Sequence, residues 1–284
     1  NYLELLGVDP SRISKTGSAM ALGTTNITPI EMAAAYGAIA NGGEYQEPLS
    51  FTRIVDESGK VILDADEIRE KHTVFKKSTA YMLVDILTEA VNSGTGTNAK
   101  ISGMTVAGKT GTNSDYGSVY FAGMTPYYTA TVWIGHDDFT PKLKSKSTGG
   151  KYAAPLWKSF MSKIHEGLQN KPIIDESPNE IGLEKCTVCS ISGKLATDAA
   201  GHLPVTDWFA KAAAPAEVCD MHVQTSICQD SGQLASPYCY NVISGSVVLI
   251  HNDSMYADID PILVKQYIPN AVYTGVTSEE YAMT

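Results

Sequence analysis

The stretch MTVAGKTGTNSDYGSVYFAGMTPYYTATVWIG, residues 104–135, holds the clearest fold signal in the chain. It contains three β-like runs, residues 104–112, 118–124 and 127–134, which are separated by turn residues that include a Thr-Pro pair. In the last run threonine and tryptophan alternate with alanine, valine and isoleucine, which is the two-residue period of a half-buried strand. The stretch therefore predicts three strands that follow one another in a sheet.

Helices are predicted on both sides of these strands. The sequence TPIE at residues 28–31 provides a capping-box start for a helix that ends at the Asn-Gly-Gly of residues 41–43. A second helix is expected from about Ser78 to residues 92–94, and an amphipathic third helix over residues 153–168. The side chains expected to face the core are Tyr81, Val84, Ile86, Leu87 and Ala90 in the second helix and Leu156, Phe160, Ile164 and Leu168 in the third. Strands flanked by helices predict an α/β or α+β arrangement.

Composition disfavours several classes of function. A chain of 284 residues predicts about two domains, and with 43% apolar and 18% charged residues it can bury a core. A formal net charge of -10 disfavours a general binder of nucleic acid or of anionic membranes. No apolar run is long enough to span a bilayer, and five cysteines are too few for a disulfide-dense scaffold.

Changes in composition divide the chain into segments. A polar, proline-containing stretch predicts a linker. Beyond it, CSISGKLAT at residues 189–197 matches CQDSGQLAS at residues 228–236, and this weak repeat predicts a small extension. The predicted segments are a first domain over residues 1–168, the linker over 169–180, the two-repeat extension over 181–241 and a β-rich tail over 242–284.

Residues 107–112, AGKTGT, permit two functional interpretations. Together with Gly103 they satisfy the phosphate-loop pattern G-x-x-x-x-G-K-[ST], which needs a helix directly after the loop to hold the phosphates. Turn residues follow here instead, and the apolar Met104 and Val106 lie inside the supposed loop. We therefore reject a P-loop nucleotide hydrolase.

In the second interpretation, Lys109, Thr110 and Gly111 belong to a β-strand beside a catalytic cleft. The lysine charge favours an anionic substrate end, and threonine hydroxyls donate hydrogen bonds to a carboxylate. Glycine admits a substrate backbone, and a strand edge can pair with an extended peptide. The same three residues also occur in ordinary exposed strands, so the motif needs support from the rest of the chain.

Short segments across residues 1–168 supply that support. They are ALG (21–23), ITPIEMAAAY (27–36), ANGG (40–43), GTG (94–96), AGKTGT (107–112), FAGMTP (121–126) and VWIGHDD (132–138). In this order and spacing they resemble the transpeptidase domain of class A (bifunctional) penicillin-binding proteins, the synthases of cell-wall peptidoglycan. The extension is similar, more loosely, to the Cys-containing C-terminal region of some Gram-positive members.

The resemblance implies the transpeptidase fold shared by penicillin-binding proteins and β-lactamases. That is an α+β fold of the three-layer α/β type, with an antiparallel sheet flanked by helices. It also implies a serine-type D,D-transpeptidase that acts on peptidoglycan stem peptides ending in D-Ala-D-Ala, is acylated by β-lactams, and needs no metal or organic cofactor. No nucleic acid is expected as a partner.

The resemblance also implies roles for the residues of the KTG strand. The implied catalytic residues are Lys109, Thr110, Gly111 and Thr112. Thr110 and Thr112 would bind the terminal carboxylate of the substrate, and Lys109 would support charge. The backbone N–H of Thr112 would form half of the oxyanion hole.

The nucleophile that this resemblance requires is missing. No lysine has a serine three residues before it, so the chain has no S-x-x-K motif. The S-x-N match at residues 177–179 follows the KTG segment and lies in the predicted linker, so we treat it as chance. We expect a fragment that is inactive alone, whose serine, S-x-N loop, glycosyltransferase and membrane anchor lie in an upstream segment of the same protein, on the extracellular face of the cytoplasmic membrane. The alternative is a non-catalytic module that binds the cell wall or a partner.

The cysteines of the extension leave three interpretations open. Cys186-x-x-Cys189 and Cys219-x-x-His222 have the spacing of zinc ligands. The extracellular setting that the resemblance implies favours disulfides among the five cysteines instead, and free structural thiols are the third possibility. The family often has a cysteine where this chain has Ala200, so the family's pairing cannot be transferred.

The histidines other than His222 carry little signal. His136, followed by Asp137 and Asp138, lies at the end of a predicted strand and is interpreted as part of a solvated loop. His165 is interpreted as surface or core packing on the third helix. The remaining three, His72, His202 and His251, have no partners at motif spacing.

Overall fold

The computed structural model describes residues 2–13, 23, 25–138, 141–197, 204–251 and 254–274. Ala21, Leu22, Ala200 and His202 lie outside the described residues. The chain divides into two units, Asn1–Ile181 and Gly182–Thr284.

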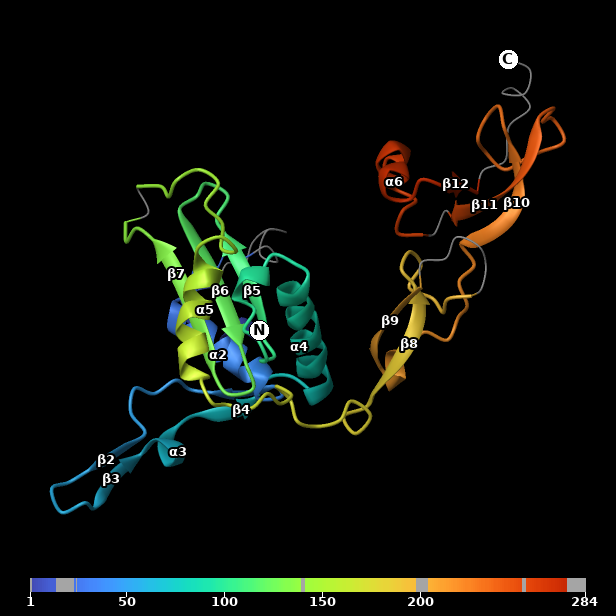
Figure 1. The fold of residues 1–284 in the computed structure, drawn as a ribbon. Helices are drawn as coiled ribbons and strands as arrows, with labels where there is room; N and C mark the ends of the chain where they lie inside the picture. The colour runs from blue at the N-terminus through green and yellow to red at the C-terminus, as the bar shows by residue number, and fades with distance from the viewer. Residues whose placement is uncertain are drawn as a thin grey trace. The chain divides into compact units, whose positions relative to one another are not determined.

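A three-stranded antiparallel sheet forms the centre of the first unit (Figure 1). Its strands, in spatial order, are β5 (Ala107–Thr112), β6 (Ser118–Met124) and β7 (Thr129–Gly135). The helices that pack on it are α2 (Pro29–Ala40), α4 (Lys77–Asn92) and α5 (Ala153–Ile164). All three predicted strands are confirmed, although the first and the last begin later than the sequence pattern suggested.

Helices α2 and α5 cover opposite faces of the sheet. Thr131 Oγ1 on β7 donates a hydrogen bond to the carbonyl of Pro29 in α2 (2.8 Å). The next residue back, Ala130, packs into the hydrophobic core on the α5 side, where its carbonyl accepts a hydrogen bond from Trp157 Nε1 (2.9 Å). Because successive side chains of a strand point to opposite faces, the two helices form separate layers. This is the expected three-layer arrangement.

Helix α2 begins at the predicted capping box. The N–H of Glu31 donates to Thr28 Oγ1 (3.4 Å), and the N–H of Thr28 donates to Glu31 Oε2 (2.8 Å). Arg12 Nη1 adds a hydrogen bond to the same carboxylate (3.0 Å). The helix ends before Gly42 and Gly43, whose φ angles of 70° and 100° suit glycine.

The core-facing side of α5 differs from the prediction. Leu156 and Phe160 are 54% and 57% exposed, and Ile164 also faces solvent. The buried residues are Ala153, Ala154, Trp157 and Met161. Both stripes of the helix are apolar, so periodicity could not choose between them. The small alanines let α5 approach the sheet, and Trp157 packs edge-to-face on Phe121 with ring centroids 5.1 Å apart.

The predicted face of α4 is wrong at one position. Ile86 is 63% exposed, whereas Ala80 and Val91 are the fully buried residues of this helix. Val91 belongs to the hydrophobic core that also contains Val106 and Phe121. The helix is therefore buried at both ends, and its C-terminal turn packs in the core next to the strand that carries the KTG segment.

The remaining elements of the first unit are short. They are α1 (Tyr2–Leu5), the 3-10 helices η1 (Pro10–Arg12) and η3 (Thr97–Ala99), α3 (Ala65–Ile68), and two antiparallel strand pairs, β1 (Glu44–Gln46) with β4 (Lys71–Thr73) and β2 (Arg53–Val55) with β3 (Val61–Asp64).

The second unit contains two small sheets. The first pairs β8 (Leu183–Cys189) with β9 (Pro204–Ala210), and the second has the order β10 (His222–Cys228), β11 (Val242–Ile250) and β12 (Ala271–Tyr273). The 3-10 helix η4 (Lys211–Ala213) and helix α6 (Pro261–Tyr267) complete the unit. One hydrophobic core joins Cys189 and Cys219 to residues of β11 and α6 such as Ile250 and Val264.

The repeat seen in the sequence is also a repeat of structure. In the first copy, the N–H of Cys189 donates to the carbonyl of Lys194, and the N–H of Gly193 donates to the carbonyl of Cys189. In the second copy, the N–H groups of Cys228 and Gly232 make the equivalent bonds, and both glycines have φ near 70°. Each copy is thus a strand that ends in a cysteine and a tight turn.

Replacing the cap of α2 tests the helix start. The substitution Thr28→Ala removes the acceptor for the N–H of Glu31, so we expect the unfolding free energy to fall by about 1 kcal/mol. Chemical denaturation of the full chain measures this change. The matched control is Thr73→Ala, at a threonine outside any helix start, and an equal loss in both variants would contradict the capping role.

The carboxylate of Glu31 should make stability depend on pH. Burial raises its pKa, but hydrogen bonds from Arg12 and Thr28 outweigh burial and hold the pKa below its ordinary value of 4.5. A lowered folded-state pKa stabilises the fold above about pH 4.5, and this contribution is lost as the pH falls through the folded value. The difference in unfolding free energy between the wild type and Glu31→Gln should therefore shrink on acidification. The matched control is Glu57→Gln, which removes one negative charge at an exposed position.

Candidate functional site

Strand β5 separates the functional side chains of the KTG segment onto two faces. Thr110 and Thr112 lie opposite Phe121 and Val119 of β6, which are buried in the core under α5. Lys109 lies opposite Ala122, whose neighbour on β7 is Thr131, on the face that α2 covers. Directly opposed residues of an antiparallel pair share a face. The two threonine hydroxyls are therefore on one side of the strand and the lysine is on the other.

The backbone of β5 presents polar groups at the edge of the sheet. The N–H of Asn113 donates to the carbonyl of Ser118 (3.1 Å), so the alternation of an antiparallel ladder points the backbone groups of Gly111 toward β6 as well. The N–H and C=O groups of Thr110 and Thr112 then point away from β6. Among the strands that the structure describes, β6 is the sole partner of β5. This edge can accept an extended peptide as an additional strand.

Thr110 is hydrogen-bonded to a second threonine. The hydroxyl oxygens of Thr110 and Thr95 are 2.6 Å apart, and either hydroxyl can be the donor. Thr95 lies in the turn after α4, inside the GTG segment quoted above. Two hydroxyls that share one hydrogen bond retain one unused proton, which can be donated to a ligand.

Thr112 is held by the loop that precedes α5. The N–H of Gly149 donates to Thr112 Oγ1 (3.1 Å), which fixes the hydroxyl as an acceptor and leaves its proton for another partner. The loop then continues past Asn98, whose Nδ2 donates to the carbonyl of Gly150 (2.8 Å). Two loops distant in sequence therefore meet on the threonine face of β5.

Gly149 lies against the backbone of the sheet. A Cβ atom at this position would be 2.3 Å from the carbonyl oxygen of Tyr120 and 2.6 Å from that of Gly111. Any side chain would push the loop away from β5, because backbone atoms cannot move aside as a flexible side chain can. The glycine is therefore a requirement for the hydrogen bond to Thr112.

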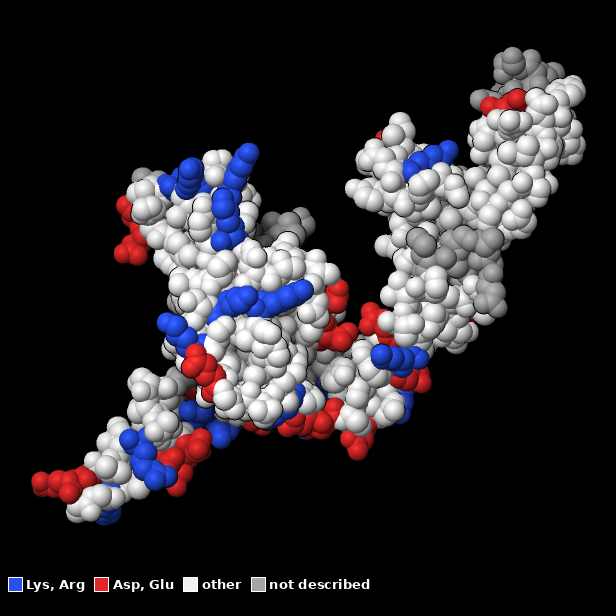
Figure 2. Space-filling view, in the orientation of Figure 1, with Lys and Arg blue, Asp and Glu red and all other residues white. Residues whose placement is uncertain are grey.

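Positive charge gathers at the end of β5, although the whole chain is acidic. The loop after β7 carries Lys142, Lys144, Lys146 and Lys151, all exposed. The loop is held against the turn between β5 and β6 by the hydrogen bond from the N–H of Leu143 to the carbonyl of Tyr116 (2.9 Å). Lys142 pairs with Asp115 (2.6 Å). Figure 2 shows lysine side chains over this end of the first unit, where they favour an anionic ligand.

The four residues named from the sequence are consecutive in β5, with Lys109 on the opposite face from the two threonines, and the structure adds other residues next to them. Lys109 is exposed, and its Nζ donates to the carbonyl of Thr110 (3.3 Å). The sequence interpretation assigned no role to Thr95 or Gly149. Thr95 lies in a quoted family segment, so its position was a usable signal, whereas Gly149 had only a neighbouring glycine to mark it.

The other candidates in the first unit do not join the site. His136, Asp137 and Asp138 are exposed after β7, as expected for a solvated loop. His165 is a core residue: it is buried, and its Nδ1 and Nε2 lie 2.7 Å from the carbonyl of Met161 and from Thr125 Oγ1. These contacts account for a buried histidine at this position without any catalytic role.

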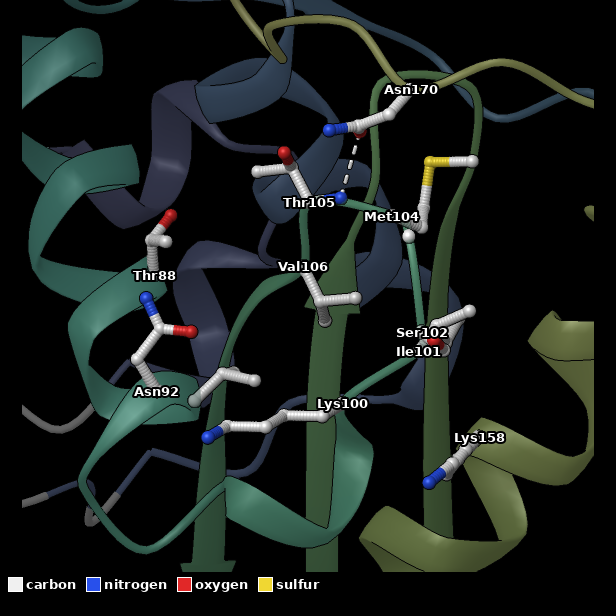
Figure 3. A pocket seen from close by; sticks show the side chains of 12 residues that line it. Thr88, Asn92, Lys100, Ile101, Ser102, Met104, Thr105, Val106, Lys158 and Asn170 are labelled. Carbon is white, nitrogen blue, oxygen red and sulfur yellow. Dashed lines mark hydrogen bonds between the residues drawn. The ribbon is translucent and has the colours of Figure 1, made fainter.

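A pocket of about 590 Å³ lies at the other end of β5 (Figure 3). It is formed by the last turn of α4, the loop of residues 100–106, Lys158 of α5 and Asn170. The N–H of Thr105 donates to Asn170 Oδ1 (2.8 Å) across one side of it. Its lining includes no residue of the KTG segment, and we do not assign the substrate to it.

The second unit contains a buried cluster of nucleophilic side chains. The Cys189 Sγ, Cys219 Sγ and one ring nitrogen of His222 lie within 4.8 Å of one another. Burial raises the pKa of the Cys219 thiol, but hydrogen bonds from Ser192, from His222 and from backbone N–H groups outweigh burial and lower the pKa to about 6. Cys186 is not part of the cluster, because in β8 it is three residues from Cys189 and points to the other face.

Comparison with known proteins identifies relatives for both units. Residues 4–162 match the family described as the penicillin binding protein transpeptidase domain. Residues 181–224 match the family described as the C-terminal domain of penicillin-binding protein 1A.

Curated relatives extend over most of the chain. Penicillin-binding protein 1A of Clostridium botulinum is 34% identical over 264 residues, which are 89% of this chain and 30% of that protein. Penicillin-binding protein 1A of Clostridium tetani is also 34% identical, over 76% of this chain and 28% of its own length. The chain thus spans less than a third of the length of these relatives.

Solved structures share the fold at lower identity. The crystal structure of penicillin-binding protein 1A from Haemophilus influenzae has a TM-score of 0.64 at 20% identity and covers 76% of this chain and 37% of that one. The PonA1 protein from Mycobacterium tuberculosis, solved in complex with penicillin V, has a TM-score of 0.53 at 21% identity and covers 60% of this chain and 49% of that one. These matches agree with the three-layer fold described above.

Substitution of Gly149 tests the close approach on which the threonine face depends. The change Gly149→Ala places a Cβ against two carbonyl oxygens, so we expect an unfolding free energy lower by about 1–3 kcal/mol. The matched control is Gly37→Ala, within α2, where nothing lies within 4 Å of the new Cβ and alanine should stabilise the helix by about 0.5–1 kcal/mol. Thermal denaturation of both variants distinguishes them, and a neutral Gly149→Ala would contradict the proposed packing.

Proposed function

The chain belongs to the penicillin-binding protein transpeptidase family, and from this premise we propose that it forms the carboxylate-binding wall of a peptidoglycan D,D-transpeptidase site. The observation that carries the proposal is the arrangement on β5. The hydroxyls of Thr110 and Thr112 lie on one face, and backbone groups of the same residues that do not pair with β6 point to the sheet edge. A C-terminal peptide needs both recognition elements, one for its carboxylate and one for its backbone.

The hydroxyl groups account for recognition of a terminal carboxylate. Gly149 supplies the hydrogen that Thr112 Oγ1 accepts, so the Thr112 proton is free to be donated to a substrate oxygen. The Thr95 and Thr110 pair offers a second proton. Hydrogen bonds to an ionised acceptor are stronger than neutral ones, and the lysine-rich end of the first unit attracts the same charge.

The edge of β5 would hold the stem peptide in an extended form. The N–H of Thr112 points away from β6, where it can donate to the carbonyl oxygen of the scissile bond as that oxygen gains negative charge. Lys109, on the opposite face, would support the charge of the reacting groups. Gly111 carries no side chain that would obstruct the approaching backbone.

The transfer itself requires the serine of an S-x-x-K motif, which this sequence does not contain. In the proposed reaction, a serine oxygen from an S-x-x-K segment attacks the carbonyl carbon between the two D-alanines, the C–N bond breaks, and D-alanine leaves with the proton on its amine. An amine of a second stem peptide then attacks the ester, an amide bond forms, and the serine oxygen regains its proton. A β-lactam acylates the same serine, but its amine stays attached to the acyl group.

We infer that the segment with the serine is an upstream part of the same protein. The apolar side chains of Leu156, Phe160 and Ile164, exposed along α5, support a packing partner for this helix. The reaction would take place on the extracellular face of the cytoplasmic membrane, where the stem peptides are. Among the helices that the structure describes, none combines the length and hydrophobicity needed to cross a bilayer.

Acylation by benzylpenicillin tests the proposal. The chain is incubated with the antibiotic alone and together with an upstream segment that carries S-x-x-K and S-x-N, and intact masses are measured. We expect a penicilloyl adduct on the upstream segment, and only when both are present. An adduct on this chain alone would show that the nucleophile lies here and would overturn the proposal.

The role of the threonine face is tested by the rate of that acylation. Thr112→Val keeps the shape of the side chain but removes the hydroxyl, so the rate should fall roughly 10- to 100-fold, as for one lost hydrogen bond to a charged group. Thr129→Val, on β7 of the same sheet, makes the same chemical change away from the site and should leave the rate unchanged. Equal rates for the two variants would contradict carboxylate binding by Thr112.

A further inference from the structure

We propose that Cys189, Cys219 and His222 bind one zinc ion, which fastens the two sheets of the second unit to each other. All three residues are buried, with 0%, 8% and 5% of their surface exposed. They come from the end of β8, the segment before β10 and the first residue of β10. The site is distinct from the proposed transpeptidase site and is independent of that proposal.

The distances within the cluster match a tetrahedral ion. The Nδ1 atom of His222 lies 3.5 Å from Cys189 Sγ and 3.5 Å from Cys219 Sγ. Zinc binds sulfur at about 2.3 Å and imidazole nitrogen at about 2.0–2.1 Å, and at the tetrahedral angle these bonds place the two ligand atoms about 3.5 Å apart. Both sulfur atoms have the separation from the nitrogen that a shared ion requires.

The sulfur atoms are also surrounded by hydrogen-bond donors. The N–H of Ile191 donates to Cys189 Sγ (3.4 Å). The Ser192 hydroxyl and the N–H groups of Met221 and His222 are directed at the sulfur of Cys219. Donors around a sulfur stabilise the thiolate, which is the form that binds metal, and such outer contacts orient the ligands of metal sites.

The donor set indicates which ion fits. Two thiolates and one imidazole are soft or intermediate ligands, which favour zinc and disfavour calcium or magnesium. The net charge of two thiolates is balanced by a divalent cation. The described residues supply three of the four positions of a zinc site, and a small ligand such as water would complete the coordination.

The second repeat provides an internal comparison. There the equivalent strand-end residue, Cys228, has Cys239 as a hydrogen-bond partner, and no histidine takes part in the contact. In the first repeat the residue equivalent to Cys239 is Ala200, so Cys189 has no cysteine from its own turn. It faces Cys219 and His222 instead, and this histidine distinguishes a metal site from a simple thiol pair.

The energetic role of the metal follows from the distant segments that supply its ligands. Cys189 and His222 are 33 residues apart in sequence, and Cys189 belongs to the core that contains Ile250 and Val264. The unfolded chain has no preformed site, so the metal binds the folded unit, and its binding free energy adds to the stability of that unit. Zinc would therefore stabilise a unit whose sheets are small.

Metal content of the full chain tests the proposal. The chain is purified with a thiol reductant, dialysed against metal-free buffer, supplied with zinc, and dialysed again, and zinc per chain is measured by inductively coupled plasma mass spectrometry. We expect about one zinc in the wild type and less than about a tenth in Cys189→Ser, Cys219→Ser and His222→Gln. The matched control Cys186→Ser, on the same strand but the opposite face, should keep the metal.

Cobalt substitution removes the ambiguity of a variant that fails to fold. Co²⁺ added to the metal-free wild-type chain should give visible bands of a tetrahedral site and a near-ultraviolet band from thiolate bound to cobalt. The proposal would be overturned if the wild-type chain retained no zinc, or if its cobalt spectrum showed octahedral coordination. It would also be overturned by a Cys189–Cys219 disulfide in the chain isolated without reductant from an oxidising compartment, or by retention of zinc by all three ligand variants.

Discussion

The antiparallel register of β5 against β6 decides where every functional group of the first unit points. With Thr110 opposite Phe121 and Lys109 opposite Ala122, the threonines share a face with the hydrophobic core and the lysine lies on the other face. A shift of one residue would exchange these faces and would also reverse which backbone groups point to the open edge. The core fixes the register, because Phe121 and Val119 are buried under α5 and could not be exposed without loss of that burial.

Close packing then arranges the polar groups of this strand into the binding surface that we propose. The loop before α5 can reach Thr112 only because Gly149 has no side chain, and the turn after α4 brings Thr95 to Thr110. Each contact uses one hydrogen-bonding capacity of a threonine and leaves another available. The hydroxyls are therefore oriented before a ligand arrives, so binding does not have to order them. Preorganisation of this kind is what a site for a charged transition state requires.

The second unit shows how one repeated structure can hold two different thiol environments. Both copies end a strand with a cysteine and close the same glycine turn. They differ in what faces the sulfur: Cys239 in the second copy, and Cys219 with His222 in the first. The spacing of Cys186 and Cys189 suggested a ligand pair, but an extended strand sends residues three apart to opposite faces, so that pair is not formed.

Local sequence was sufficient for the elements themselves. Turn residues, a two-residue period and a capping box act over a few residues, and they predicted the three strands, the start of α2 and the KTG strand in nearly their observed positions. The family and the fold class also followed from short segments in a fixed order. Local sequence could not decide which of the two apolar stripes of α5 is buried, because Trp157 and Phe160 are both large and apolar. Packing against the sheet buries Trp157 and leaves Phe160 exposed. The partners of Thr112 and of Cys189 likewise lie 37 and 33 residues away, so only the packing of distant segments could bring them together.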